Sequence, residues 1–328
     1  MRRIFFISIL ATICSASFIQ AQSTNDLYLT KSFSDAAFKK INAETTHGDI
    51  AVSVVPAANA RIEVYIRSSD SREDLSKEQI KKRLDEYYTL DVSLDGDVVR
   101  AVAHRKVDFT NLKPSLRISF MIYATKSKST VLKTDHGNLE ISGMEGNQKL
   151  TTDHGDIGAE NINGKLLAVT DHGNINVKES NDDIDIRTDH GDLVLNNVKG
   201  KVHATTDHGN VDGHVIDGVL YASTDHGDVN FGNLTCSVET STDHGNITLS
   251  FEKVSGDIKA DNSDGDISMQ VPKGNGLNLD LRGKSVDMSS AEVFSGSMNK
   301  DEVNGTLNGG GSKVYARTNR GQISLKVR

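Results

Sequence analysis

A tetrapeptide, Thr-Asp-His-Gly, recurs every 18 residues and constrains the fold more than any other feature of this 328-residue sequence. Seven copies occur without a slip in the spacing, and a related Asn-Ser-Asp-Gly follows after a two-residue insertion. A fixed period of this kind is typical of repeat proteins, in which each unit packs against its neighbours. The seven strict copies begin at Thr134, Thr152, Thr170, Thr188, Thr206, Thr224 and Thr242.

Apolar residues within each unit alternate with polar ones in short runs. We number each unit from its threonine as position 1, so the second unit has Ile157 and Ala159 at positions 6 and 8, and Leu166 and Ala168 at positions 15 and 17. A period of two is typical of half-buried strands and fits no helical face. Glycine at position 4, and often at position 13, marks the bends between strands. The pattern predicts an all-β fold, a parallel β-solenoid whose 18-residue coils stack about 4.8 Å apart.

Position 5, directly after the first glycine, alternates between an amide and a carboxylate. Two carboxylates one coil apart repel each other by about 1 kcal/mol even in a water-like dielectric. Interleaved asparagines double the separation of the charges and keep a side chain that turns favour. We therefore expect a double coil to be the unit of duplication. The column reads Asn138, Asp156, Asn174, Asp192, Asn210, Asp228, Asn246 and Asp266.

The N-terminal residues predict export. Residues 1–21 begin with two arginines, continue with an apolar stretch over 4–13 and reach a cleavage position after Ala21, as in a signal peptide. No later stretch is long and apolar enough to span a membrane, so we expect the mature chain in the periplasm, on the outer surface or secreted. Loss of Cys14 with the leader leaves Cys236 alone, which excludes an intramolecular disulfide. A net charge of −8 argues against a nucleic-acid partner.

The residues that flank the regular array carry further strands and one helix. Ser76 and Gln79 resemble a capping box and predict a helix over 76–88, and Asp95-Gly96 predicts the turn of a hairpin over 90–104. The chain then divides into a signal peptide, an N-terminal solenoid edge or cap with this helix-hairpin insertion, the regular 18-residue-repeat solenoid, and C-terminal rungs with a cap, at residues 1–21, 22–133, 134–270 and 271–328.

Three motifs together resemble the bacterial "putative adhesin" domain family, a domain of unknown function. They are a Gly-Asp/Asn-Ile/Leu/Val triplet once per coil, an alternating strand over 116–122, and a glycine-rich return at 309–311 to a final Thr-Asn-Arg-Gly-Gln-Ile. The resemblance covers residues 40–328 and implies a right-handed β-solenoid in an exported or cell-envelope protein with an adhesion role. It brings no catalytic residues. Asp-His before the glycine departs from the small polar residues that family members carry there.

The repeated Asp-His pair allows two interpretations. Imidazoles on adjacent rungs, helped by carboxylates, could hold a divalent metal such as Zn²⁺, Cu²⁺ or Ni²⁺. Alternatively, each aspartate caps the corner by bonding a backbone N–H while the histidine fills a polar outer position. A histidine column beside aspartates could also respond to pH. The candidate ligands are His136, His154, His172, His190, His208, His226 and His244 with Asp135, Asp153, Asp171, Asp189, Asp207, Asp225 and Asp243.

The sequence favours a binding or structural role over catalysis. Catalysis needs one constellation with differentiated pKa values, whereas the repeat supplies seven equal copies. The non-repeat residues His104, His203, His214 and Cys236 show no nucleophile or acid-base signature. We expect an exported adhesin-like module without catalysis or cofactor, whose partner is an envelope or surface protein or glycan. The alternatives are a metal-binding or pH-responsive protein and a polysaccharide-acting β-helix enzyme.

Overall fold

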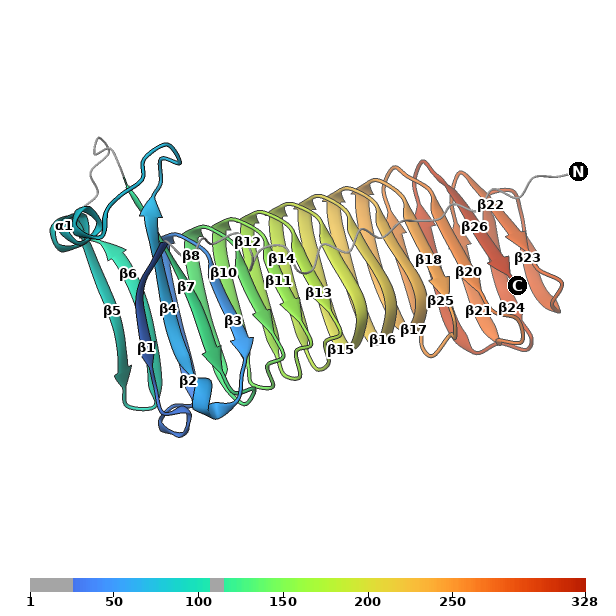
Figure 1. The fold of residues 1–328 in the computed structure, drawn as a ribbon. Coiled ribbons are helices and arrows are strands. Elements are labelled where there is room, and N and C mark those ends of the chain that lie inside the picture. The colour runs from blue at the N-terminus through green and yellow to red at the C-terminus, as the bar shows by residue number, and fades with distance from the viewer. Residues whose placement is uncertain (1–25, 107–114) are drawn as a thin grey trace, which may run out of the picture.

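The computed structural model describes residues 26–106 and 115–328, so the predicted signal peptide lies outside the described residues. The described chain is built from 26 strands in one hydrogen-bonded sheet, with a single α-helix at one end. Figure 1 shows the strands side by side in a long row, with the helix α1 and strand β23 at opposite ends. The all-β prediction is confirmed.

The repeat forms two ladders of parallel strands, one before and one after the conserved glycine. Partners in neighbouring rungs lie 18 residues apart, as in Thr152 with Thr170 and His154 with His172. After the two-residue insertion the offset becomes 20 residues, as in Val238 with Ile258. The strands are β8 (Ser129–His136), β9 (Leu139–Ser142), β10 (Gln148–His154), β11 (Ile157–Glu160), β12 (Leu166–His172), β13 (Ile175–Lys178), β14 (Ile184–His190), β15 (Leu193–His208), β16 (Val211–His226), β17 (Val229–His244), β18 (Ile247–Phe251), β19 (Ile258–Asn262) and β20 (Ile267–Val271).

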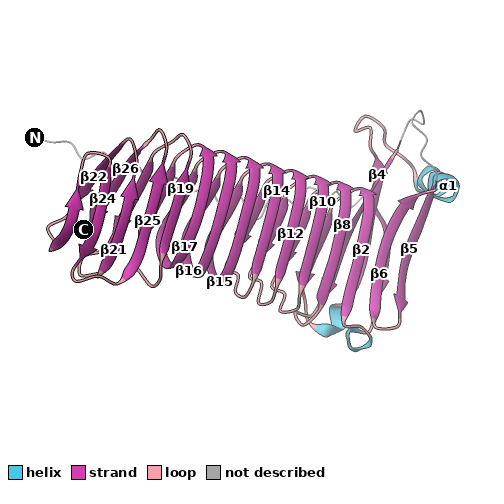
Figure 2. Ribbon diagram, turned by 180° about the vertical axis from the view of Figure 1, so that it is seen from behind, coloured by secondary structure: helices cyan, strands magenta, loops and turns pink. Residues whose placement is uncertain are grey.

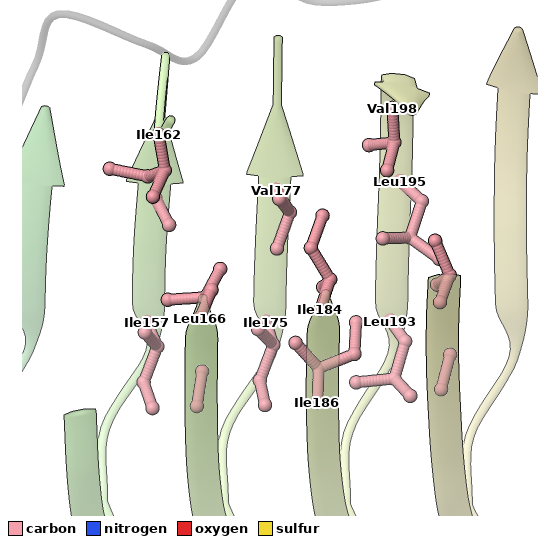
Figure 3. Packing of buried hydrophobic residues seen from close by; sticks show 14 of the residues in the cluster. Ile157, Ile162, Leu166, Ile175, Val177, Ile184, Ile186, Leu193, Leu195 and Val198 are labelled. Carbon is pink, nitrogen blue, oxygen red and sulfur yellow. The ribbon is translucent and has the colours of Figure 1, made fainter. Parts of the chain in front are cut away.

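The core is a narrow apolar column between the two ladders. Figure 3 shows side chains of successive rungs, such as Ile157, Ile175 and Leu193, stacked at equivalent places in the interior. Burial of such ladders removes apolar surface from water in every rung and stabilises each rung against the next. The predicted position-6 ladder is at most 1% exposed throughout, at Leu139, Ile157, Ile175, Leu193, Val211, Val229, Ile247 and Ile267.

The conserved glycine is required by close contact between rungs. In the seven strict copies its φ lies between +153° and +159°. A Cβ placed on it would lie 2.0–2.1 Å from the carbonyl oxygen of the equivalent glycine in the preceding rung. That same carbonyl accepts a hydrogen bond of 2.9–3.1 Å from the threonine Oγ1 at position 1, which is buried. Threonine and glycine together therefore hold neighbouring rungs in close contact at the turn between the two ladders, which we call the corner.

The N-terminal end is assembled out of chain order. Strand β2 pairs with β8 on one side and β6 on the other, and β3 pairs with β9 and β7. The helix α1 (Lys77–Tyr87) has the predicted Ser76–Gln79 capping box, and β5 and β6 form the predicted antiparallel hairpin. The strands are β1 (Leu27–Ser32), β2 (Lys40–His47), β3 (Ile50–Val54), β4 (Arg61–Ser68), β5 (Tyr88–Asp95), β6 (Val98–Arg105) and β7 (Leu116–Ala124), with 3₁₀ turns at Asp35–Ala37 and Ala57–Asn59.

A buried ion pair connects the segment after β1, which contains Asp35, to Lys128, directly before β8. The Lys128 Nζ lies 3.0 Å from Asp35 Oδ2 and donates hydrogen bonds to the carbonyl oxygens of Asp35 and Phe38 at 2.7 and 2.8 Å. Burial raises the pKa of Asp35, but hydrogen bonds from Thr125 and the Lys128 ammonium outweigh it and leave that pKa below the ordinary 3.8. The pair is therefore charged, and both side chains have partners for their polar atoms.

The C-terminal end is also out of chain order. The last two strands, β25 and β26, lie between the rung of β19 and β20 and the strands β21 and β22. β24 and β23 continue from β21 as antiparallel strands. The strands are β21 (Leu277–Arg282), β22 (Ser285–Ser289), β23 (Phe294–Met298), β24 (Glu302–Leu307), β25 (Ser312–Thr318) and β26 (Gln322–Val327).

Candidate functional site

The histidines at position 3 form one exposed column along a corner of the molecule. Successive ring centroids lie 4.6–4.8 Å apart, and successive ring planes are parallel within 5°. The structure thus brings all seven predicted histidines together. It adds His47, which stacks on His136 because β2 pairs with β8. The signal for His47 was the Thr-Thr-His-Gly at 45–48, but its place beside His136 depends on strand pairing across about 90 intervening residues.

Charged side chains stand at both ends of the histidine column. At the C-terminal end, Asp264 takes position 3 in the rung after His244, and its Oδ2 lies 3.4 Å from the His244 Nε2. Arg320 follows in the next rung and contacts Asp264 at 3.2 Å. At the N-terminal end, burial lowers the pKa of His47, and repulsion from His136 and Arg105 lowers it further. The column is therefore flanked by fixed charges rather than by more imidazoles.

The aspartates at position 2 form a second column beside the histidines. Asp189 lies 3.3 Å from Arg187, and Asp243 accepts a hydrogen bond of 3.1 Å from Ser263. The side chains of the remaining five make no hydrogen bond or ion pair with any part of the chain that the structure describes; they are Asp135, Asp153, Asp171, Asp207 and Asp225. The interpretation that these aspartates cap backbone N–H groups is therefore wrong for these five.

Position 5 does the capping instead. Each side-chain Oδ1 in this column accepts a hydrogen bond from the backbone N–H of the position-5 residue in the next rung, as Asn138 does from Asp156 and Asp156 does from Asn174. Nine such bonds of 2.7–3.0 Å run from Asp49 to Gln322. Asparagine and aspartate both supply the acceptor oxygen, so alternation halves the charge without loss of the ladder.

The stacked geometry does not assemble a coordination sphere. Zn²⁺ lies about 2.0–2.1 Å from each imidazole nitrogen, so two ligands must aim their lone pairs at one point. Parallel rings 4.8 Å apart aim theirs side by side. Within residues 26–106 and 115–328, no group of three or more His, Cys, Asp or Glu side chains is arranged to hold a metal ion. The predicted ligands are therefore adjacent but not convergent.

The non-repeat candidates do not form a constellation with one another. Cys236 is fully buried, and burial raises the pKa of its thiol to about 12, so the thiol stays protonated. His203 stacks on Tyr221 at 4.5 Å, His214 contacts Asn233 at 3.1 Å, and His104 lies 3.6 Å from Glu44. Each is engaged with a different neighbour.

A shallow groove of about 340 Å³ crosses the outer face of the later rungs. Tyr221 and Tyr315 line it together with the carboxylates of Glu239 and Asp257. Glu239 is paired with Lys259 at 2.8 Å, and Asp257 accepts a hydrogen bond of 2.9 Å from the backbone N–H of Lys313. Both carboxylates therefore have structural partners, unlike five of the seven aspartates of the corner.

None of the described helices is long and apolar enough to cross a membrane. The stacked rungs and the exposed polar columns place the molecule among all-β repeat proteins. Residues 220–326 match the model of the Toastrack DUF4097 family, which confirms the predicted resemblance to a domain family of unknown function over that part of the chain.

Two solved structures are similar to this chain over most of its length. One is a putative cell adhesion protein from Clostridium sporogenes, with 10% identity, a TM-score of 0.23, and coverage of 92% of this chain and 98% of that chain. The other is a putative adhesin from Bacteroides fragilis, with 14% identity, a TM-score of 0.36, and coverage of 92% and 96%. At such values neither likeness bears on the function of this chain. No curated protein matches it.

Proposed function

We propose that the protein is an exported adhesin-like binding module of the cell envelope without catalytic activity. The observation that carries the proposal is the exposed corner, where eight stacked histidines run beside a column of seven aspartates, five of whose side chains make no hydrogen bond or ion pair with the described residues. Equal side chains at equal spacing suit a ligand with repeated polar groups, such as a surface protein or glycan. They do not differentiate an acid from a base, as catalysis requires.

A rigid scaffold supports this role. We propose that the repeat is a right-handed solenoid of 18-residue coils, regular over residues 134–270 and capped by residues 22–133 and 271–328. The 18-residue offset between parallel partners supports the coil length. Right-handed connections between parallel strands of one sheet are the strong preference of L-amino-acid chains, which supports the handedness. Such a scaffold presents its side chains at fixed spacing and needs no ordering when a ligand binds.

Export is part of the same proposal. The basic and apolar organisation of residues 1–21 supports a signal peptide. An acidic, stacked domain is suited to the periplasm or the cell surface. It would not need a disulfide there, because each rung is stabilised by its contacts with the neighbouring rungs. Fractionation of cells that express the full chain tests this step, and a cytoplasmic, uncleaved product would contradict it.

Binding is tested by replacing part of the corner and measuring attachment. The triple change His172→Ser, His190→Ser and His208→Ser removes three adjacent rings, and Asp171→Asn, Asp189→Asn and Asp207→Asn removes three adjacent charges. We expect either variant to weaken attachment of protein-coated beads to envelope preparations and to arrays of surface glycans by about ten-fold.

The matched control changes three outward side chains of the same rungs on the other ladder, Lys178→Ser, Asn196→Ser and His214→Ser. It should attach like the unchanged protein. Equal attachment by all variants would remove the corner from the proposal, and turnover of a polysaccharide by the unchanged protein would replace the proposal with the enzyme alternative.

A further inference from the structure

Strand β23 leaves one edge of the sheet open at the C-terminal end of the molecule. It pairs with β24 on one side, and no described strand pairs with its other side. Figure 1 places it at the end of the stack opposite the helix, and Figure 2, seen from behind, shows its partner β24 at that same end. Val293, directly before the strand, and Met298, its last residue, are 76% and 49% exposed. An open edge with exposed apolar side chains is a template for another strand.

The usual protections of an edge strand are missing from β23. Its five residues, Phe-Ser-Gly-Ser-Met, contain no charge and no proline. At the other end of the molecule, by contrast, the edge strand β5 packs against the helix α1 and carries Asp91 and Asp95. Strands β1 and β22 also have one described partner strand each, but they carry the charged residues Lys31 and Asp287. β23 is therefore the least protected of these edges, which favours pairing of this edge with itself over head-to-tail stacking of copies.

The sequence of this edge is complementary to itself in antiparallel register. With Gly296 opposite Gly296 of a second copy, Ser295 faces Ser297 and Phe294 faces Met298. Beyond the two ends of the strand, Glu292 and Lys300 lie in bends, and the same register brings Glu292 of one copy near Lys300 of the other. Neither of these two side chains makes an ion pair within the described residues. Two-fold symmetry repeats every contact, so one dimer would gain two apolar pairs and two ion pairs.

We propose that β23 joins two copies of this chain, tail to tail, through an isologous antiparallel strand pair centred on Gly296. The dimer would continue one ladder from one molecule into the next and would point the two histidine corners away from a shared centre. This inference is independent of the proposed binding role, since it rests on the edge and its flanking charges alone. A one-residue slip would set Phe294 against a serine and separate the charges, so the register is specified.

Charge reversal tests the register directly on the purified full chain. Glu292→Lys and Lys300→Glu each replace two attractive contacts by two repulsive ones, and each should raise the dimer dissociation constant about ten-fold in sedimentation equilibrium. The double variant restores both attractions and should dimerise like the unchanged protein. The control Glu252→Lys changes the net charge equally at an exposed site outside the edge and should have no effect.

Cysteine cross-linking supplies a second readout. A mixture of Ser295→Cys and Ser297→Cys chains should form a disulfide-linked dimer on oxidation, because these positions face each other, and either variant alone should form much less. Cys236 is buried and does not interfere. The proposal would be overturned by a protein that stays monomeric at all concentrations up to the millimolar range. It would also be overturned if neither Glu292→Lys nor Lys300→Glu changed the dimer dissociation constant.

Discussion

Replacing the corner glycine of one rung tests the contact that sets the spacing of the stack. Gly155 has φ of +156°, and a Cβ on it would lie 2.0 Å from the Gly137 carbonyl oxygen. In Gly155→Ala the rungs must separate locally. The backbone bond from Gly155 to His172 and the bond from Thr170 Oγ1 to the Gly155 carbonyl would weaken. Strain of about 1–3 kcal/mol at such a φ, plus about 0.5–1.5 kcal/mol for each of the two lost bonds, predicts a loss of about 2–6 kcal/mol.

Gly158, three residues further on in the same coil, provides the matched control. A Cβ on Gly158 would meet only the Glu140 Cγ, at an ordinary van der Waals distance of 3.8 Å, and its φ lies outside the left-handed region. Gly158→Ala should therefore stabilise the protein by about 0.4–1 kcal/mol, because alanine reduces the entropy of the unfolded chain. Each variant differs from the unchanged protein by one methyl group, yet the two should change the free energy of unfolding in opposite directions.

Urea denaturation followed by far-ultraviolet circular dichroism measures the global effect. Hydrogen exchange of β10 and β11 measures the local one, because a repeat stack can open rung by rung. Gly155→Ala should lower the urea midpoint and speed exchange in these two strands and their neighbours. If Gly155→Ala unfolds within about 0.5 kcal/mol of the unchanged protein, or if Gly158→Ala is equally damaging, the close-contact argument is refuted.

Three further outcomes follow from other contacts. Asp35→Asn should lower the free energy of unfolding by about 3–5 kcal/mol, because it leaves the buried Lys128 ammonium without its counter-charge. Since folding lowers the pKa of Asp35, its contribution is present above pH 3.8 and is lost as the pH falls below that value, so the variant and the unchanged protein should converge in stability in acid. Val215 has φ of +58°, where the equivalent residues one rung away are Asn197 and Asn233 at +54° and +53°, so Val215→Asn should raise the thermal midpoint by an amount worth about 1 kcal/mol, and a fall would contradict the strain. Zn²⁺ titrated into the purified protein should give no tight uptake in proportion to the histidines; stoichiometric binding in calorimetry, lost with His172, His190 and His208, would show that the rings rearrange to converge.

The regular part of the fold could be predicted because its information is local and repeated. Glycine at position 4 and an apolar residue at position 6 recur in every strict unit, apolar residues recur in most units at positions 8, 15 and 17, and the position-4 glycine and the position-6 residue are used in the same way throughout the structure. The Ser76–Gln79 capping box and the Asp95-Gly96 turn are likewise local signals, and both elements form where they predict them.

The ends and the chemistry of the corner could not be predicted in the same way. His47 reaches His136 only because the chain leaves the stack after β3 and returns at β8, and β25 enters the stack between β19 and β21. Such pairings depend on long-range competition between strand edges, which no short motif records. The sequence also contains aspartate at positions 2 and 5, and only the direction of each side chain decides that position 5 reaches the next backbone N–H.

Distances between spin labels test most directly whether side chains 18 residues apart stack on one another. Val131, His203 and Glu239 point outward from one ladder, in rungs separated by regular steps. At about 4.8 Å per rung, labels on cysteines at Val131 and His203 should lie about 19 Å apart, and labels at Val131 and Glu239 about 29 Å apart. Buried Cys236 should stay unlabelled. A linear increase of about 10 Å for these two further rungs is the predicted result, and equal or shorter distances for the more distant pair would contradict the stacked architecture on which the binding corner depends.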